Sequence, residues 1–281
     1  VYTRPGSYGV RLTITTTDGQ QAHLTRSIQV QRGLVVPTTY PTIQSAIDAA
    51  NDGDAVIVLP GTYQETLAIR EKSITLQSRD PEDDAVVQST ILCGSEFGRP
   101  TLTIGNGSGA TVAGFSIYSG PQSVTVCPTC QGIVYIREAA PTIVRNRIAD
   151  SNNGGIVVVE SAARIERNTI VNNSSYSPGG GIVVDSYLVA PRISHNHFEG
   201  NSAPSGGALF ITATAATVVD PASAAMTVVT GNSFRGNSAH LFGGGAIFVE
   251  YVGNLYLETP DSNTYIGNSP EAIFYVVPPV P

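Results

Sequence analysis

Apolar and polar residues follow two different periodicities along this chain of 281 residues. One set of apolar side chains recurs at helical spacing: Ile43, Ala46, Ile47 and Ala50. This spacing predicts a short amphipathic helix over about residues 41–51. Most other apolar runs, such as Ala55–Leu59, have the length of a strand and end at glycine, proline or asparagine. The pattern therefore predicts a mainly β-structure with one helix near its start.

Two segments before the helix, Tyr8–Ile14 and Thr25–Val30, alternate with a period of two. Thr17–Gly19 between them is a turn signal, so the pair predicts a β-hairpin. Two strands alone are marginally stable in water. We therefore expect the hairpin to pack on the helix, on another molecule, or on sequence upstream of Val1, because the chain reads as part of a longer precursor.

Short strands are also expected between the helix and residue 120. They are predicted at Leu67–Ile69, Ser73–Leu76, Thr90–Leu92, Thr101–Ile104 and Ala113–Ile117. The acidic stretch Asp80–Asp84 and the glycine-rich stretch Gly105–Gly109 are expected to be a loop and a turn.

An internal repeat becomes legible from Gly132 onward. Glycine opens an apolar strand at Gly132, Gly155, Gly181, Gly207 and Gly245, with Ala272 as a degenerate sixth position, so the spacings are 23, 26, 26, 38 and 27 residues. The longest spacing is assigned to an insertion at Ala213–Ala225. A unit of this size, built from short strands and turn residues, is one coil of a solenoid.

An asparagine series runs in phase with the glycines. It consists of Asn146, Asn168, Asn196, Asn232 and Asn263, and five residues after each comes Ser151, Asn173, Asn201, Asn237 or Asn268. Like residues of successive coils stack at the strand spacing of about 4.8 Å. We expect the first series to form a structural ladder of hydrogen-bonded amides at the corners of the coils.

The stretch YPTIQSAIDAANDGDAVIVLPGTY resembles the N-terminal cap and first coil of the pectin-lyase-like family of right-handed parallel β-helices. The phrases FEGNSAPSGGALF and FRGNSAHLFGGGAIFV resemble the repeat of chlamydial polymorphic outer-membrane proteins, which we interpret as a surface β-helix. RPGSYGVRLTITTTDGQQAHLTRSIQV resembles the last two strands of a PKD-type immunoglobulin-like domain. These resemblances imply an all-β chain: an incomplete PKD-like hairpin over residues 1–34, then a right-handed parallel β-helix (solenoid) with a capping α-helix over residues 35–281.

Amino-acid composition argues against some classes of binding partner. Only 13% of residues are charged and the formal net charge is −7, which argues against nucleic acid or an anionic membrane surface as a partner. No apolar run approaches the ~20 residues that span a bilayer. We expect a secreted or cell-surface protein.

The three cysteines are Cys93, Cys127 and Cys130. A Cys-x-x-Cys motif is half of a zinc site, but a structural zinc site needs four ligands. A disulfide between Cys127 and Cys130 is the preferred interpretation for an oxidising compartment, so no metal site is predicted.

Four acids follow the repeat glycines at similar distances: Glu138, Glu160, Asp185 and Glu250. They are expected near one edge of one sheet, where stacked carboxylates could act as a retaining glycosidase pair or bind calcium. The simpler interpretation is that they mark the solvated ends of strands, and Thr212 interrupts the row. No motif supports calcium, and no cofactor is expected.

Basic residues offer a second candidate surface. The arginines Arg137, Arg145, Arg147, Arg164, Arg167 and Arg192 could line a groove for an acidic polysaccharide or form surface ion pairs. His195 and His197 are candidates for a general base or for ordinary exposed positions. Asn106, Asn172 and Asn173 begin glycosylation sequons. The characteristic motifs of polygalacturonases, pectate lyases and alginate epimerases are missing.

Two functions are consistent with these features. The first is a non-catalytic structural or adhesive surface protein, whose hairpin and terminal strand Ala272–Val277 join copies end to end or bind other surface proteins. The alternative is a polysaccharide lyase, hydrolase or epimerase, or a carbohydrate-binding module, with a groove along the β-helix. Because fold does not decide function and no catalytic motif is present, we favour the first.

Overall fold

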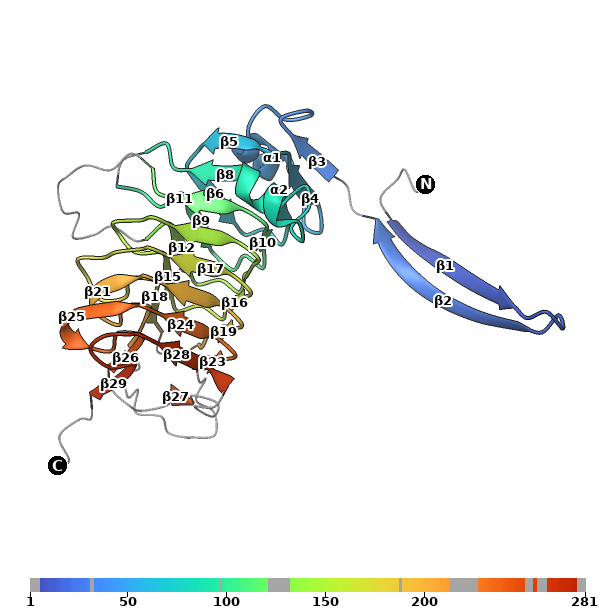
Figure 1. Ribbon diagram of the computed structural model, residues 1–281. Helices are drawn as coiled ribbons and strands as arrows, with labels where there is room; N and C mark the ends of the chain where they lie inside the picture. The colour runs from blue at the N-terminus through green and yellow to red at the C-terminus, as the bar shows by residue number, and fades with distance from the viewer. Residues whose placement is uncertain are drawn as a thin grey trace.

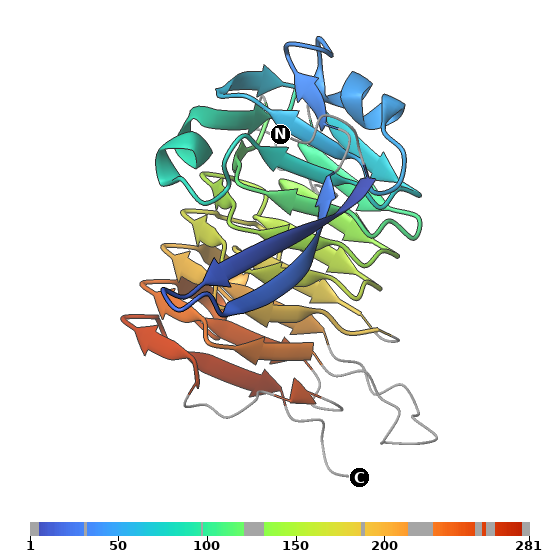
Figure 2. The ribbon, with the colours of Figure 1, turned by 90° about the vertical axis from the view of Figure 1, so that its right-hand side faces the viewer.

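The computed structural model of the chain describes residues 6–30, 33–96, 98–120, 132–186, 189–212, 227–250, 255–256 and 262–276. Three long parallel sheets run along one axis and form a stack of coils (Figures 1 and 2). From β4 onward, consecutive strands along the chain belong to different sheets, and strands of the three long sheets pair with their counterparts one coil later. This arrangement confirms the predicted parallel β-helix.

We number the three sheets 1 to 3. Sheet 1 consists of β3 (Gly33–Val36), β4 (Ala55–Val58), β7 (Thr75–Ser78), β10 (Thr111–Ala113), β13 (Thr142–Val144), β16 (Arg164–Glu166), β19 (Arg192–Ser194), β23 (Thr227–Thr230) and β27 (Leu255–Tyr256). Sheet 2 consists of β5 (Gly61–Gln64), β8 (Thr90–Cys93), β11 (Ser116–Tyr118), β14 (Arg147–Ala149), β17 (Thr169–Val171), β20 (His197–Glu199), β24 (Ser233–Arg235) and β28 (Thr264–Ile266). Sheet 3 consists of β6 (Leu67–Arg70), β9 (Leu102–Gly105), β12 (Val134–Arg137), β15 (Ile156–Val159), β18 (Ile182–Asp185), β22 (Leu209–Thr212), β26 (Ile247–Glu250) and β29 (Ile273–Val276).

The core lies between the three sheets. Along β18, Ile182 and Val184 are buried whereas Val183 and Asp185 are partly exposed, because successive side chains of a strand point to opposite faces. The same alternation in each coil produces one apolar column from Leu34 to Val249. Inside it the rings of Phe198 and Phe234 stack with centroids 4.8 Å apart.

The repeat glycines allow successive coils to approach closely. A Cβ atom added to Gly155 would lie 2.4 Å from the carbonyl oxygen of Gly181, and one added to Gly181 would lie 2.5 Å from that of Ala208. A Cβ atom at Gly207 would likewise lie 2.4 Å from the carbonyl oxygen of Gly245. The glycine that opens each repeat strand is therefore explained by backbone contact between coils.

Helix α1 (Ile43–Ala49) covers the N-terminal end of the stack. Its N-cap Thr42 forms a capping box with Ser45, and the Glu65 carboxylate accepts hydrogen bonds from the backbone N–H groups of Ile43 and Gln44 at 2.8 and 3.0 Å. The side-chain ammonium of Lys72 donates to two carbonyls in the last turn of the helix, those of Ile47 and Asp48. The predicted cap helix is thus present, within the expected bounds.

A second helix, α2 (Asp84–Ser89), was not predicted. The expected loop at Asp80–Asp84 leads into it, because the carboxylate of Asp83 caps the helix by accepting from the Ala85 N–H at 2.9 Å. Val87 is its one buried residue, and the helix packs on β8 and β11 of sheet 2. The helix therefore covers part of the outer face of sheet 2.

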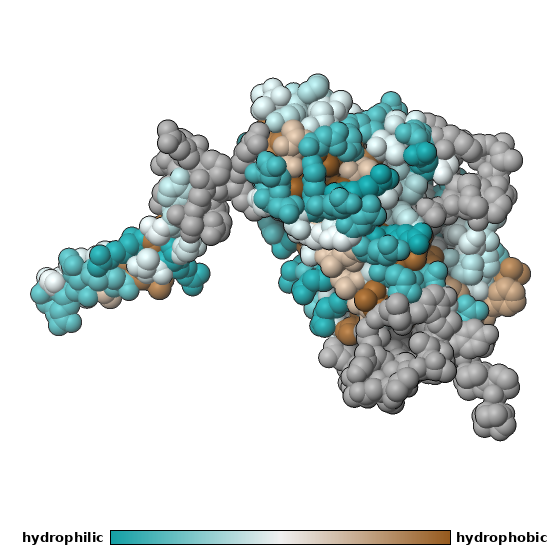
Figure 3. Space-filling view, turned by 180° about the vertical axis from the view of Figure 1, so that it is seen from behind, coloured by the Kyte–Doolittle hydropathy of each residue, from teal (hydrophilic) through white to brown (hydrophobic). Residues whose placement is uncertain are grey.

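Two smaller sheets complete the described chain. Strands β21 (Ser202–Ser205) and β25 (Ser238–Gly243) pair in parallel beside the stack. The predicted hairpin consists of β1 (Gly6–Thr15) and β2 (Gln21–Val30), in antiparallel register with Leu12 opposite Leu24. Figure 1 draws it clear of the coils, and Figure 3 shows hydrophobic side chains on its surface. Leu12, Ile14 and Leu24 are 54–59% exposed.

Candidate functional site

The five asparagines of the first series form a buried ladder. In the first four, the backbone N–H and the side-chain amide both donate to Oδ1 of the asparagine one coil later, at 2.8–3.2 Å. Every side-chain amide also donates to a backbone carbonyl one coil earlier. All five residues are at most 6% exposed. Their amides are used in hydrogen bonds within the chain and stabilise the corner between sheets 1 and 2.

A second ladder runs along the other edge of sheet 2. Asn173, Asn201 and Asn237 each donate two hydrogen bonds to the next asparagine at 2.9–3.1 Å, ending at Asn268, and the Ser151 N–H donates to Asn173. Asn173 is fully buried, so its side chain leaves no room for a glycan in the folded chain. Asn106 and Asn172 are exposed.

The four candidate acids lie at the end of sheet 3 strands but in two register positions. Glu138 and Glu160 follow β12 and β15 in the left-handed conformation, with φ of 50° and 41°. Asp185 and Glu250 are one position earlier, as the last residues of their strands, with Thr212 between them in register. Glu71 occupies the same register position as Glu138, two coils earlier, in a part of the chain where the sequence repeat cannot be recognised. The acids therefore do not form a single row.

Glu138 is engaged in a local ion pair. Its carboxylate lies 3.0 Å from Nε of Arg137, and both side chains are about 60% exposed, at 60% and 59%. A general acid that works near neutral pH needs burial or a like charge to raise its pKa. Glu138 is instead exposed and paired with a cation.

Three of the six candidate arginines lie on a different face, the outer surface of sheet 2. A pocket of about 290 Å³ lies between α2 and the sheet, lined by Pro81, Asp84, Val87, Gln88, Arg145, Asn146, Arg147, Arg167 and Thr169. It shares Arg147 and Thr169 with a wider pocket of about 630 Å³, lined also by Val171, Asn172, His197, Glu199, Gly200, Arg235 and Gly236. We call the two together the trough, with a narrow part under α2 and a wide part beyond it.

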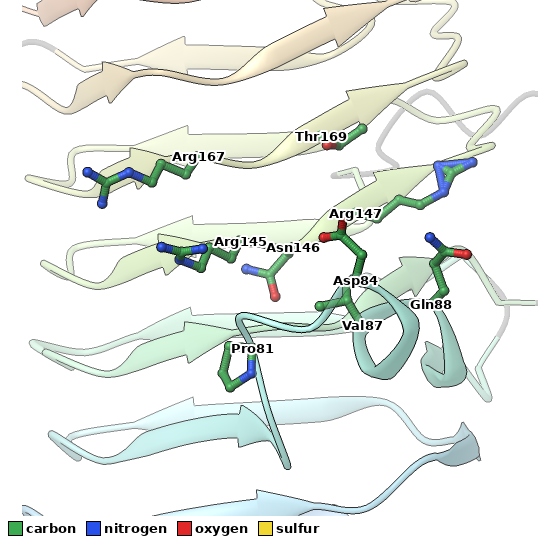
Figure 4. A pocket seen from close by; sticks show the side chains of 9 residues that line it. All are labelled: Pro81, Asp84, Val87, Gln88, Arg145, Asn146, Arg147, Arg167 and Thr169. Carbon is green, nitrogen blue, oxygen red and sulfur yellow. The ribbon is translucent and has the colours of Figure 1, made fainter.

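Arg147 projects from β14 where the two parts meet. Its Nη2 atom is 3.8 Å from the Asp150 carboxylate, too far for a hydrogen bond, and its Nη1 atom is buried without a hydrogen-bond partner. The side chain as a whole remains 30% exposed. Figure 4 shows Arg147 on one side of the narrow part, Arg145 and Arg167 on the other, and Asp84 of α2 pointing between them.

Arg145 and Arg167 come from equivalent corner turns of consecutive coils. Each precedes a ladder asparagine and has a φ of 56°, a conformation that glycine adopts in the corresponding turns at Gly114 and Gly231. The guanidinium of Arg145 pairs with Glu82 at 2.6 Å. Within the described ranges, Arg167 has no ion pair and its side chain is exposed.

The wide part of the trough contains a compensated charge cluster. The imidazole of His197 donates to the Glu199 carboxylate at 3.1 Å, and Nε of Arg235 is 3.7 Å from the same carboxylate. The hydrogen bond from His197 lowers the pKa of Glu199 below its usual value, and the charges of His197 and Arg235 act in the same direction. His195 occupies an exposed corner turn with a φ of 57°, so the two histidines face different surroundings.

Half of the arginines named from the sequence lie in the trough. Arg145, Arg147 and Arg167 are there, whereas Arg137 is on sheet 3 and Arg164 and Arg192 are adjacent on sheet 1. Sequence reasoning missed Arg235 as a trough residue. Its signal was available, because Arg235 occupies the strand position that Glu199 occupies one coil earlier.

Other candidate sites are limited. Cys93 is a free cysteine whose thiol donates to the Ser119 carbonyl at 3.3 Å. Cys127, Cys130 and the insertion Ala213–Ala225 lie outside the described residues, so the disulfide and the insertion stay predictions. Among the residues that the structure describes, no group of three His, Cys, Asp or Glu side chains could hold a metal ion. No helix in the same residues is long and apolar enough to cross a membrane.

Comparison with known proteins supports the architecture. A comparison with curated proteins found no match, and neither did a comparison with solved structures. The family model of the right-handed β-helix region matches residues 80–220, half of the chain. The matched residues contribute strands to all three long sheets, so the match agrees with the parallel β-helix seen in the structure. The chain therefore belongs to the right-handed β-helix family.

Proposed function

We propose that this chain is a non-catalytic structural or adhesive β-helix of a secreted or cell-surface protein. The observation that carries the proposal is the separation of the two sets of charged residues. The candidate acids lie at the edge of sheet 3, whereas three of the six candidate arginines, Arg145, Arg147 and Arg167, lie in the trough on sheet 2. Acid–base catalysis on a bound anionic sugar needs both sets around one substrate. Binding without reaction needs only the arginines.

The internal order of the stack suits a load-bearing role. Two asparagine ladders continue from coil to coil, and the aromatic stack Phe198–Phe234–Tyr265 continues between them. Each ladder amide holds both its own coil and its neighbours, so a coil cannot shift without breaking several buried hydrogen bonds. Such a column is stiff along its axis and presents its outer faces at fixed spacing.

One observation favours the alternative, a polysaccharide-active enzyme. Glu138 and Glu160 occupy equivalent positions of adjacent coils, so their backbones are about 4.8 Å apart. This spacing is close to the ~5–5.5 Å between the carboxyl groups of a retaining glycosidase. The exposure of Glu138 and its pairing with Arg137 weigh against that role.

In this proposal the hairpin and the last described coil provide surfaces for assembly. The hairpin β1–β2 exposes one apolar face, and the last described coil exposes Ile266 and Phe274 at 60% and 37%. In this proposal the hairpin belongs to an immunoglobulin-like domain of the PKD type and joins the β-helix to other copies or other surface proteins. Paired strand edges and apolar faces of this kind are common routes of surface-protein association.

A paired assay tests the proposal. The purified chain is incubated with polygalacturonate, alginate and hyaluronan, and new reducing ends and unsaturated products are measured. We expect no turnover above the background of a Glu138→Gln, Glu160→Gln double variant. Turnover that the double variant abolishes would overturn the proposal in favour of the enzyme. Electron microscopy of the same preparation checks assembly, for which regular filaments are the expected result.

A further inference from the structure

The residues 79–89, which include α2 and which we call the α2 segment, replace a short turn at one corner of the stack. At the equivalent corners two residues connect sheet 1 to sheet 2, such as Gly114 and Phe115 between β10 and β11, or Arg145 and Asn146 between β13 and β14. Between β7 and β8 the same step takes the eleven residues of the α2 segment. Because neighbouring coils turn this corner without such a segment, the β-helix itself does not require it.

Few contacts hold the α2 segment against the stack. Val87 is the one buried residue of its helix, and a helix of six residues is not stable without packing. An ion pair joins Glu82 of the segment to Arg145 at 2.6 Å, with side chains 67% and 36% exposed. An ion pair this exposed stabilises little and weakens as salt is added. Segments with so few buried contacts open at a low free energy while the rest of the fold stays intact.

The polar atoms next to the α2 segment are poorly satisfied. Among the described residues, Ser78 Oγ, Ser116 Oγ and Arg147 Nη1 are buried without a hydrogen-bond partner. Ser78 directly precedes the segment, and Ser116 and Arg147 are register neighbours on β11 and β14, with α2 packed on β11. A buried polar group without a partner is unfavourable, and water satisfies it once its cover is removed. The closed position of the segment is therefore opposed by the atoms that it covers.

Gly114 shows how closely the α2 segment lies on the next coil. A Cβ atom added to Gly114 would overlap Ser78 Oγ and would lie 2.6 Å from the Cα atom of Pro81. The equivalent turn position carries a side chain at Arg145 and Arg167, which have a left-handed backbone as well. The missing side chain at position 114 therefore leaves the room that the α2 segment occupies when it is closed.

We propose that the α2 segment is a lid on sheet 2 that opens while the coils stay folded, with the ion pair between Glu82 and Arg145 as its latch. Opening gives water access to Ser116 and Arg147 and costs the burial of one apolar side chain, that of Val87. The two sides of this balance are small and opposed, which is the condition for a lid that moves readily.

The lid controls access to the outer face of sheet 2. When it is closed, α2 forms one wall of the narrow part of the trough (Figure 4). When it opens, Ser116, Arg147 and Thr169 form one continuous polar row across β11, β14 and β17. The narrow part then becomes an open groove that is continuous with the wide part. This inference goes beyond the proposed function and does not depend on it.

Hydrogen–deuterium exchange of the full 281-residue chain, read by mass spectrometry of its peptides, measures the opening. We expect the amides of α2, such as that of Val87, which donates to the Asp83 carbonyl at 3.0 Å, to exchange about a hundredfold faster than those of β8 and β11. Exchange in α2 should depend only weakly on urea, because local opening exposes little surface. Exchange as slow as that of β11, or with the urea dependence of global unfolding, would overturn the lid.

A charge substitution tests the latch. Glu82→Gln removes the ion pair with Arg145 and should speed exchange in α2 several-fold, and added salt should act in the same direction on the unmodified chain. Glu96→Gln is the control, because it removes an exposed ion pair with Arg99 at 3.0 Å in the connection between β8 and β9. Equal effects of the two substitutions on exchange in α2 would refute the latch.

A glycine substitution tests the closed position. Gly114→Ala places a Cβ atom against Pro81 and should speed exchange in α2 about tenfold or more, because the lid can no longer close fully. Gly231→Ala is the control at the equivalent turn, where the added atom would meet the side chain of His195 at 3.0 Å, and should leave exchange in α2 unchanged. Unchanged exchange in α2 in a folded Gly114→Ala variant would contradict the close approach of the lid.

A chemical probe reports on the surface that the lid covers. Ser116→Cys introduces a thiol at a position that is 1% exposed, and its alkylation by iodoacetamide is read on its own peptide, separately from that of Cys93. We expect its rate to follow exchange in α2 and to rise when Glu82→Gln is added. A thiol that reacts only under conditions of global unfolding would overturn the lid. Should this variant fail to fold, exchange in the unmodified chain still decides the question.

Discussion

Replacing Asn196 by alanine tests how much the first ladder contributes to stability. Oδ1 of Asn196 accepts from the backbone and the side-chain amide of Asn168 at 2.9 and 3.0 Å, and its own amide donates to the Ile165 carbonyl at 2.8 Å. The alanine variant leaves the Asn168 N–H and the Ile165 carbonyl without these partners in a buried corner. An unsatisfied buried group costs about 1–3 kcal/mol, so the two together predict a loss of about 2–6 kcal/mol.

Equilibrium urea unfolding followed by far-UV circular dichroism measures this loss. Thr169→Ala is the control, because Thr169 lies on β17, next to the strand β20 that follows Asn196, and its side chain is exposed. Substitutions at exposed positions usually change stability by no more than about 0.5 kcal/mol. A loss for Asn196→Ala that equals that of the control, with an unchanged denaturant slope, would refute the reasoning. It would mean that water or neighbouring amides replace the ladder bonds at no cost.

Further predictions concern packing, titration and local stability. Gly181→Ala should destabilise the chain by about 2 kcal/mol or more in urea unfolding. Gly105→Ala is the control and should have little effect, because its Cβ atom would have its nearest contact at 3.4 Å. Equal effects of the two substitutions would contradict the close approach of coils. Carbon-13 NMR of Glu199 should give a pKa below its usual value, and His197→Ala should raise it. Because this pKa is lowered on folding, the contribution of Glu199 to stability is present above the ordinary carboxyl pKa and is lost as the pH falls through the pKa of the folded state. An unshifted pKa would contradict the hydrogen bond from His197. Amides of the hairpin β1–β2 should exchange with deuterium about a hundredfold faster than those of sheet 3; equal protection would show that its apolar face is covered.

The repeating parts of the molecule were predictable because identical chemistry recurs at fixed spacing. An asparagine that bonds to the asparagine of the next coil recurs at the same place in successive coils, so Asn168 and Asn196 mark their coils in the sequence. The glycines carry a similar signal because the next coil's backbone occupies the position of their Cβ atoms. Helix α1 was predictable because its apolar face covers the end of the core over two turns.

The trough was not predictable, for two physical reasons. Helix α2 has six residues and buries only Val87, so no helical period can be recognised in it. The residues of sheet 2 that face outward are not constrained by the core, so Arg147, Thr169 and His197 follow one another in register without any repeat of residue type. The offset between Glu160 and Asp185 has a similar origin, since it depends on where each strand enters its turn.

The two asparagine ladders also determine where this chain can change in length. The arc between the ladders is always five residues long, as from Asn196 to Asn201, because any extra residue would move a buried amide out of reach of its neighbours. The return path through sheets 3 and 1 varies from 17 residues between Ser151 and Asn168 to 31 between Asn201 and Asn232. A foreign segment introduced between β22 and β23 would therefore be displayed at the side of the stack while the corners keep their spacing. The fold thus separates a fixed half of each coil from a half that can accept new sequence.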